Sequence, residues 1–488
     1  MDWKAAGSML SRLTLALAAL MIPPMITAFS YGQTLAGAGF VSAQAALIAL
    51  SLPFIIRLAK GGEIRAKARS EAASVNAKTG FLSVGFSWLL LGLFAALPLF
   101  IGGYYKNYLA SFCDVISMLT TTGTVLTSLE KPVDITLTLY YALLQWFGGI
   151  GVLSLITVIL PKTEKVSIRF LKAEGSAPDF GKETGKLRYN VRIIFIIYGA
   201  LTALLFLLLL TSRTSAFGSL VIALTTISTS GYTGIVPLIT ANSYSNALVG
   251  VFALLAATNF TLFYLLCIGK IKDAVKNEEL RLFVIIIAFS LIAVTAANLV
   301  ARAYSTFGET VLNSFVATAL NQSSTGFDAV DIEKWSSFAV ILLFVMSFFG
   351  GCVGSTAGGL KLARVLVLAK SLKRDINKAL TPNGVYTVRL NGEVLSENAV
   401  HSSWSYFALY FIIIGISFVL VSVGGDFENA FQKLTYVTGA MNNTNSPFFA
   451  APLELPLFSK VVLSFDMLLG RLEIFPVLLL FNVNAYRK

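Results

Sequence analysis

The sequence of 488 residues has little of the chemistry on which most catalytic and metal sites depend. His401 is its one histidine, which argues against histidine dyads and histidine-ligated metals. Its cysteines, Cys113, Cys267 and Cys352, lie far apart without CxxC spacing, so a disulfide framework or a zinc site is not expected. Charged residues make up only 13% of the chain. We therefore expect no catalytic residue and no cofactor in this chain, and an enzyme is disfavoured.

Apolar residues, by contrast, account for 56% of the chain, a share that is typical of all-α polytopic membrane proteins. A helix of about 20 apolar residues crosses a bilayer. The apolar stretch near the N-terminus lacks a small-x-small cleavage site and is followed directly by another, so we expect a retained helix rather than a signal peptide. The sequence predicts ten membrane spans, at about 11–30, 36–58, 80–102, 136–160, 191–211, 244–268, 282–302, 335–369, 402–424 and 455–482.

The net charge of +12 is explained by the connections between these spans. Lysine and arginine gather at 57–78, at 162–192 and from Lys361 to Arg389, whereas 124–135 and 327–334 have few of them. The positive-inside rule places the basic connections, and with them both termini, in the cytoplasm. A lipid bilayer is thus the expected surroundings, and nucleic acid is not needed as a partner.

Four further apolar stretches of about a dozen residues are too short to cross a membrane, and a turn rich in hydroxyl groups follows each. The turns read MLTTTGTVL, TISTSGYTG, NQSSTGFDA and AMNNTNSPF. One such turn alone is more typical of a helix C-cap. Four in register favour repeated units of span, re-entrant half-helix, turn and span around one axis. The shared register aligns Gly123, Gly231, Gly326 and Asn445, and eleven residues earlier Phe112, Leu220, Phe315 and Leu434.

The turns have the composition of a cation filter. Rings of backbone carbonyls replace the hydration shell of an ion, and irregular backbone survives at membrane depth only where it is buried or lines a cavity. Glycine permits left-handed backbone values, Ser and Thr add hydroxyl oxygens, and the helix dipole directs its negative end at a cation. The predicted ion-binding residues are Thr121, Thr122, Gly123, Thr229, Ser230, Gly231, Ser324, Thr325, Gly326, Asn443, Thr444 and Asn445.

Further stretches carry a resemblance to a known family. LLQWFGGIGVLSL at 143–155, NFTLFY at 259–264, GGCVGSTAGGLKLARVLVL at 350–368 and MLLGRLEIF at 467–475 resemble the TrkH-type potassium uptake subunits of the Trk/Ktr/HKT superfamily, almost from end to end. The two extra N-terminal spans are similar to TrkH rather than to the shorter KtrB form. The resemblance implies potassium uptake across the bacterial cytoplasmic membrane, a pseudo-tetramer of four M1-P-M2 repeats, a homodimer, and a cytosolic nucleotide-binding regulatory subunit of TrkA type.

The resemblance and the turns together divide the chain into five parts. Residues 1–78 form two N-terminal helices and a cytoplasmic linker, and four repeats follow. These are predicted at 79–165, 166–272, 273–380, with a broken M2 helix, and 381–488.

One predicted span contains a glycine-rich interruption. Each glycine costs a helix about 1 kcal/mol relative to alanine, so a break is expected there. The spacing of Gly350 and Gly354 also fits close helix packing of the small-xxx-small type. The resemblance implies an intramembrane gating loop below the filter, made of Gly350, Gly351, Gly354, Gly358, Gly359 and Lys361.

Arg471 lies deep in the last predicted span. An arginine at the bilayer centre costs about 2.5–3.5 kcal/mol on insertion scales, so it should face the pore or a carboxylate. The alternatives are a buried ion pair with Asp466 or Glu473 and snorkelling to the interface, although Glu473, two residues away, points to a different helix face. The resemblance implies a positively charged barrier in the pore.

The fourth turn departs from the family pattern, because NNTNSP stands where TrkH proteins usually carry NNLGPG. Asparagine tolerates positive φ better than most residues, so we expect Asn445 to keep the backbone path. The departure leaves open a less selective monovalent cation channel and a non-conducting scaffold. Coupled K⁺/Na⁺ or K⁺/H⁺ symport also stays open. ATP hydrolysis by this chain is not expected, since the order Gly-Lys-Ser/Thr is missing from its glycine-rich stretch.

Overall fold

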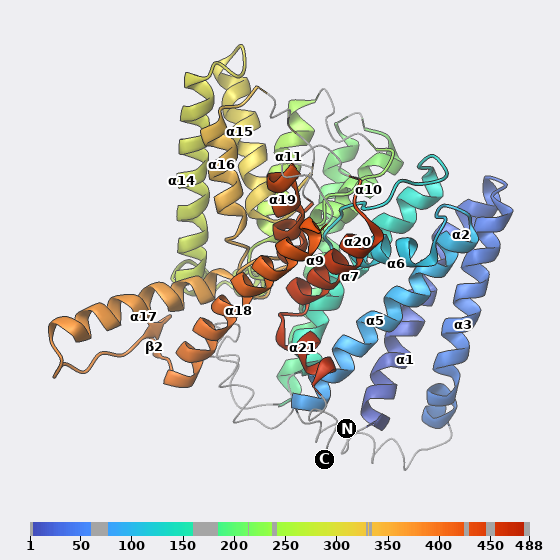
Figure 1. Ribbon diagram of the computed structural model, residues 1–488, viewed down its shortest axis with the longest axis horizontal. Coiled ribbons are helices and arrows are strands. Elements are labelled where there is room, and N and C mark those ends of the chain that lie inside the picture. The colour runs from blue at the N-terminus through green and yellow to red at the C-terminus, as the bar shows by residue number, and fades with distance from the viewer. Residues whose placement is uncertain are drawn as a thin grey trace.

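A computed structural model of the protein describes residues 3–59, 77–159, 184–212, 214–236, 242–327, 330, 334–423, 429–445 and 454–482. Most of this part of the chain is helical (Figure 1). The predicted all-α class is thereby confirmed. The basic connections predicted at 57–78 and 162–192 lie mostly outside the described residues.

Three N-terminal helices form one side of the molecule, next to the first long helix of the remainder (Figure 1). Pro23 and Pro24 open the second of them, because proline fits the first turn of a helix, where its missing amide is not needed. The ring of Phe40 packs edge-on against Tyr140, with 4.9 Å between the ring centroids. The helices are α1 (Trp3–Leu20), α2 (Ile22–Ser30), α3 (Thr34–Ala59) and α5 (Ala77–Ile101).

Four short helices precede the four predicted turns. Ser215 and Thr306 cap two of them, accepting the amides of Gly218 and Glu309 at 3.0 and 3.2 Å. With 12 to 16 residues each, they reach about 18–24 Å, less than the hydrocarbon core of about 30 Å. They are α6 (Tyr108–Leu119), α10 (Ala216–Ile227), α15 (Phe307–Gln322) and α19 (Ala430–Asn442).

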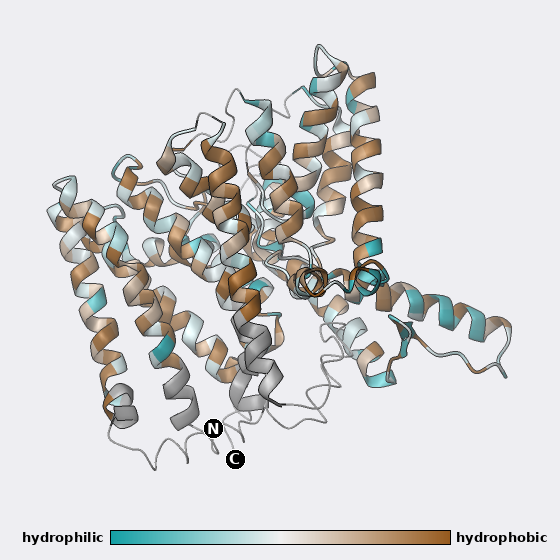
Figure 2. Ribbon diagram, turned by 180° about the vertical axis from the view of Figure 1, so that it is seen from behind, coloured by the Kyte–Doolittle hydropathy of each residue, from teal (hydrophilic) through white to brown (hydrophobic). Residues whose placement is uncertain are grey.

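Long apolar helices surround the short ones, and their outward faces are hydrophobic (Figure 2). On one of them Val284, Ile285, Phe289 and Ile292 expose 55 to 69% of their surface, which suits lipid and not water. Besides α5, these helices are α7 (Ile135–Ile159), α9 (Thr184–Leu210), α14 (Glu278–Val300) and α18 (Glu397–Ser422).

Three predicted spans are broken. The break at Phe348–Lys361 confirms the expected interruption of span 335–369. The spans at 244–268 and 455–482 were predicted as continuous, which is wrong: the former bends by 93° where Asn259 begins a new helix by accepting the amide of Thr261 at 2.8 Å. The pieces are α11 (Ser243–Ala256) with α12 (Phe260–Cys267), α16 (Ser337–Ser347) with α17 (Leu362–Leu380), and α20 (Leu457–Arg471) with α21 (Phe475–Phe481).

Within the described residues, six helices are long and apolar enough to cross a membrane, or seven if the bent pair α11 and α12 is one span. The broken spans account for part of the difference from the predicted ten. The first helix of the described chain begins, and the last one ends, at the same end of the molecule (Figure 1).

The basic stretch from Lys361 to Arg389 forms an arm beside the bundle. In it α17 extends sideways from the bundle (Figure 1) and carries hydrophilic residues along its length (Figure 2). A small hairpin of β1 (Arg389–Leu390) and β2 (Glu393–Val394) connects α17 to α18, and the short α13 (Ile271–Val275) precedes α14.

Candidate functional site: a ring of four turns

The four turns share one backbone conformation. In each, the amide of the residue before the aligned position donates to the carbonyl five residues earlier, as Thr122 does to Ser117 at 2.9 Å. This pattern is the Schellman C-cap. The residue two places before the aligned position is left-handed in every turn, with φ of 50 to 58°. These residues are Thr121, Thr229, Ser324 and Asn443. The C-cap interpretation, treated as an alternative, is thus correct for each turn taken singly.

The left-handed positions carry backbone strain. Threonine is branched at Cβ, and Thr121 and Thr229 occupy a region that such residues normally avoid. Strain of this kind persists where the surroundings impose it and is concentrated at functional sites. The strain was not predicted, because positive φ was expected only at the aligned positions of the four turns.

The aligned position differs between the turns. Gly123, Gly231 and Gly326 have φ of 72, 99 and 58°, as predicted for glycine. Asn445 is absent from the left-handed residues of the described chain. The expectation that Asn445 keeps the glycine conformation is therefore wrong, and the left-handed asparagine of this turn is Asn443.

Main chain packs against main chain at three junctions between the turns, and the first two involve Gly123 and Gly231. A Cβ added to Gly123 would lie 2.6 Å from the carbonyl oxygen of Ser230 in the second turn. One added to Gly231 would lie 1.8 Å from the carbonyl oxygen of Thr325, in the third. Only glycine permits this approach, so the first turn contacts the second, and the second contacts the third.

The remaining junctions close the ring. A Cβ on Gly326 would lie 2.6 Å from the carbonyl oxygen of Asn445. Asn445 accepts a hydrogen bond from Thr124 Oγ1 at 3.1 Å, and Asn443 Nδ2 donates to Thr122 Oγ1 at 3.2 Å. The fourth turn thus contacts both the third and the first, and the four turns form a closed ring of neighbours.

All twelve predicted ion-binding residues are buried in this ring. Three of their side-chain oxygens have no hydrogen-bond partner among the described residues: Thr121 Oγ1, Ser230 Oγ and Asn443 Oδ1. Buried polar atoms are normally paired. Uncharged oxygens at the negative ends of four helix dipoles are suited to weak, reversible coordination of a cation.

The glycine-rich segment 348–361 lies against the ring. At its tip the hydroxyl of Thr356 donates to the carbonyl of Ile227 at 3.1 Å, and the amide of Gly358 donates to Ser324 Oγ at 2.7 Å. A Cβ on Gly358 would lie 2.0 Å from the carbonyl oxygen of Asn442. The tip therefore contacts the ends of α10, α15 and α19 together.

Glycine permits close approaches within the segment as well. A Cβ on Gly350 would lie 1.9 Å from the carbonyl oxygen of Gly358. Gly354 and Gly359 have φ of 75 and 74°. Lys361, the last residue before α17, donates its ammonium to the carbonyl of Ala357. Helix packing of the small-xxx-small type is excluded here, since Gly350 and Gly354 lie outside any helix.

Gly351 joins the segment to the end of α11. A Cβ there would lie 2.8 Å from the carbonyl oxygen of Ala257, and the amide of Cys352 donates to the same oxygen at 2.9 Å. The loop is thus fixed at its flank as well as at its tip.

Arg471 is the last residue of α20, and it connects the glycine-rich segment to α7. It is 4% exposed, and its guanidinium donates to the carbonyls of Thr356 at 2.7 Å and Gly148 at 3.2 Å. Among the described residues Arg471 forms no ion pair with the two carboxylates named as alternatives. Glu473 pairs with Arg364 at 2.7 Å, and Asp466 accepts from Ser417 at 2.8 Å.

Arg471 has no counterpart of its kind after the other three turns. It lies 26 residues after Asn445, and the same offset from Gly123, Gly231 and Gly326 gives Gly149, Ala257 and Cys352. At the position where three turns are followed by a small residue, the fourth is followed by a long cation that contacts both the tip of the segment and α7.

Two polar residues at the turns were missed from the sequence. Asp114, fully buried in α6, accepts the amide of Leu126 at 2.9 Å and the hydroxyl of Tyr105 at 2.8 Å. Gln145 of α7 donates to the carbonyl of Tyr232 at 3.1 Å. Each holds the chain just after a turn. The signal for Asp114 was present, because an acidic residue inside an apolar half-helix marks function by default.

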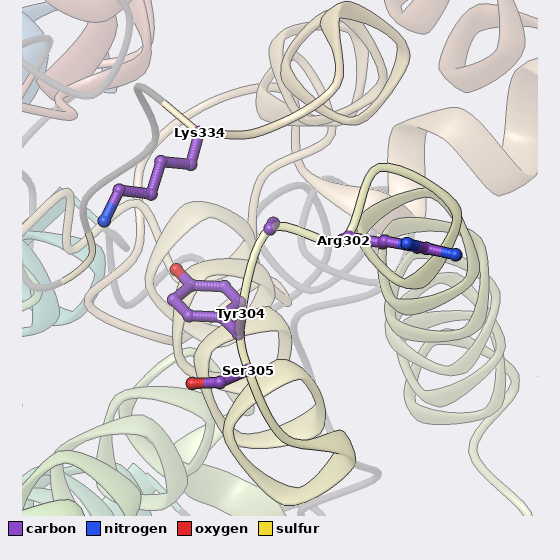
Figure 3. A pocket seen from close by; sticks show the side chains of 5 residues that line it. Arg302, Tyr304, Ser305 and Lys334 are labelled. Carbon is purple, nitrogen blue, oxygen red and sulfur yellow. The ribbon is translucent and has the colours of Figure 1, made fainter.

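A surface cavity of about 580 Å³ lies apart from the ring, where α14 connects to α15. Lys334 and the hydroxyl of Tyr304 extend on the same side of it, while Arg302 points away (Figure 3). The lining residues are Arg302, Ala303, Tyr304, Ser305 and Lys334. Two of these described lining residues, Arg302 and Lys334, are cationic.

The chain is similar to several known proteins along its length. The family model TrkH, described as "Cation transport protein", matches residues 48–486. The Trk system potassium uptake protein TrkG of Escherichia coli K12 is 28% identical and covers 96% of this chain and 95% of its own. TrkH of the same organism is 28% identical over the whole of both chains. The crystal structure of the potassium transporter TrkH from Vibrio parahaemolyticus superposes with a TM-score of 0.84, at 25% identity and complete coverage of both chains.

Proposed function

Since the chain belongs to the TrkH family of cation transport proteins, we propose that it is the membrane-embedded, ion-conducting subunit of a bacterial potassium uptake system. The family consists of transport proteins and is not an enzyme class. Potassium is the cargo, in keeping with the names of the relatives in Escherichia coli. The single observation that carries the proposal is the closed ring of four turns.

The ring is the selectivity filter in this proposal. Its buried oxygens without hydrogen-bond partners, on Thr121, Ser230 and Asn443, belong to three of the four turns, as ligands around one axis would. Four M1-P-M2 repeats with the predicted boundaries account for the shared turn geometry. No carboxylate lies in the twelve filter residues, which keeps binding weak enough for release.

The segment 348–361 is the gate, and Arg471 is the barrier below the filter. Support comes from the position of the tip, which contacts the ends of three short helices and accepts a hydrogen bond from Arg471. An ion leaving the ring past this tip requires its displacement. The guanidinium opposes a resident cation through its charge.

Uptake follows the membrane potential. About 2.3 kcal/mol per charge per 100 mV supports an accumulation of roughly fiftyfold at about 1.4 kcal/mol per decade. Coupled symport is the second candidate. A proton relay would need carboxylates inside the membrane, and two of them, Asp466 and Glu473, are bonded to Ser417 and Arg364, which disfavours them in that role.

The assembly and location follow the family resemblance and the charge pattern. We place the protein in the cytoplasmic membrane with both termini inside. Two copies of the chain form a homodimer, and a cytosolic nucleotide-binding regulatory subunit of TrkA type binds to it. The chain needs no cofactor of its own.

Flux measurements in proteoliposomes test this function. With an imposed potential, purified protein should admit potassium and rubidium in preference to sodium, and uptake should rise with the potential. Flux that requires a proton or sodium gradient would instead establish symport. Equal leakage of all three ions, insensitive to potential, would contradict a selective pathway.

A further inference from the structure

Glu279 in the first turn of α14 holds the glycine-rich segment from outside it. Its side chain is 2% exposed. A single oxygen, Oε1, accepts the amide of Val353 at 2.7 Å and the amide of Ala363 at 3.1 Å. Val353 precedes the tip at Thr356–Gly358, and Ala363 follows it in the first turn of α17, so one carboxylate joins the two flanks of the tip.

The burial of this carboxylate is costly unless its hydrogen bonds offset the lost hydration. Apart from Glu279, the flanks meet in a short parallel bridge, in which the amide of Gly350 donates to the carbonyl of Leu360 at 2.9 Å. Glu279 lies on another element, α14, whose N-terminal end lies beside the start of α17 (Figure 1). It therefore fastens the segment to the bundle and not merely to itself.

The preceding residue provides a natural contrast. Glu278 forms an ion pair with Lys370 of α17, and both side chains are about one third exposed, at 31 and 32%. Exposed pairs of this kind contribute little. Two adjacent glutamates thus have different tasks: Glu278 contacts the arm at the surface, and Glu279 contacts the segment inside.

We propose that Glu279 is the positioning residue that holds the gating segment at rest by fastening the amides of Val353 and Ala363. This inference rests on the proposed function of 348–361 as the gate. Loss of the acceptor leaves two buried amides unpaired, which favours conformations in which the flanks separate and the tip leaves the ring.

Two readouts keep the inference and the proposed function apart. The first is alkylation of Cys352, which is buried next to Val353, in a background with Cys113→Ser and Cys267→Ser. It reports the position of the segment without any ion flux. The second is potassium flux into proteoliposomes without a regulatory subunit, together with the ratio of potassium to sodium flux.

The variants are Glu279→Leu, Glu279→Gln and, as the matched control, Glu278→Gln. Glu279→Leu should increase both the alkylation rate and the flux at least about tenfold, because two hydrogen bonds to a charged group are lost, and the ion ratio should stay unchanged. Glu279→Gln keeps an acceptor oxygen and should retain most of the wild-type behaviour, while Glu278→Gln should match the wild type. If the leucine variant does not fold, Glu279→Asp, too short to reach both amides, serves in its place.

Faster alkylation with unchanged flux would support the fastening by Glu279 and refute the gate. An alkylation rate in Glu279→Leu, or in its aspartate substitute, no higher than in Glu278→Gln would overturn the inference, whatever the flux.

Discussion

Three junctions of the ring differ from the fourth in the atoms that make them. Between the first and second, second and third, and third and fourth turns, a glycine Cα lies against a neighbouring main-chain oxygen. Between the fourth and the first, the contacts are side-chain hydrogen bonds of Asn445 and Asn443. The ring is thus closed by two kinds of contact, although its four C-caps share one backbone geometry.

The two kinds of junction respond differently to sequence change. A main-chain junction admits no Cβ, so any substitution of its glycine moves the backbone. A side-chain junction changes in small steps, because one hydroxyl or amide can be replaced while the backbone remains. Substitutions are therefore expected to be better tolerated at the seam between the fourth and first turns than at the other three junctions.

The largest effect is expected from breaking a main-chain junction. Gly231→Ala places a Cβ at 1.8 Å from the carbonyl oxygen of Thr325, at a φ of 99°. Overpacking of this kind costs about 1–3 kcal/mol or more. Potassium uptake by cells that depend on this protein should fall by about a hundredfold.

Gly308→Ala is the matched control for that experiment. Gly308 lies in the first turn of α15, and a Cβ there meets nothing within 4 Å. Normal uptake by both variants would show that the turns are not packed against one another.

An intermediate effect is expected at Asp114, which braces the first turn next to the side-chain seam. Asp114→Asn removes the charge from the hydrogen bonds to Leu126 and Tyr105, and such bonds contribute about 1.5–3 kcal/mol. Potassium flux should fall roughly tenfold, with a lower potassium-to-sodium ratio. Asp466→Asn, at a buried carboxylate bonded to Ser417, should leave the ratio unchanged. An equal change of ratio in both variants would mean that the loss of any buried charge is responsible.

The smallest effect is expected within the seam itself. Thr124→Val removes the donor to Asn445 Oδ1, a bond of about 1 kcal/mol, and should change the potassium-to-sodium ratio about threefold. In an Asn445→Gly background the same substitution should do nothing further, because the acceptor is gone. A double-mutant cycle of flux ratios measures this coupling, and full additivity would show that the bond plays no part in selection.

Local patterns allowed much of the fold to be predicted. Apolar stretches of a dozen residues gave the short helices, and the register of Gly123, Gly231 and Gly326 gave the turns that meet in the ring. The glycines at 350–359 gave the break between α16 and α17. These features depend on propensities that each segment has on its own.

Features that depend on distant partners were not predictable. The 93° bend before Asn259 fits the adjacent loop, whose Gly354 carbonyl accepts the amide of Phe260 at 3.1 Å. The left-handed threonines run against their own propensity and are imposed by the turn. Asp114 and Glu279 each bind amides of another segment, and the sequence alone does not specify which amides come within reach.

Ser324 belongs to both parts of the site. It is the left-handed residue of the third turn, and its hydroxyl accepts the amide of Gly358 at the tip of the glycine-rich segment. Under the proposed function, ion occupancy and the resting state of the tip are then thermodynamically linked, and linkage is reciprocal. If a bound ion changes the equilibrium constant for release of the tip by some factor, release of the tip changes the affinity for that ion by the same factor. The transported ion is then an effector of its own passage.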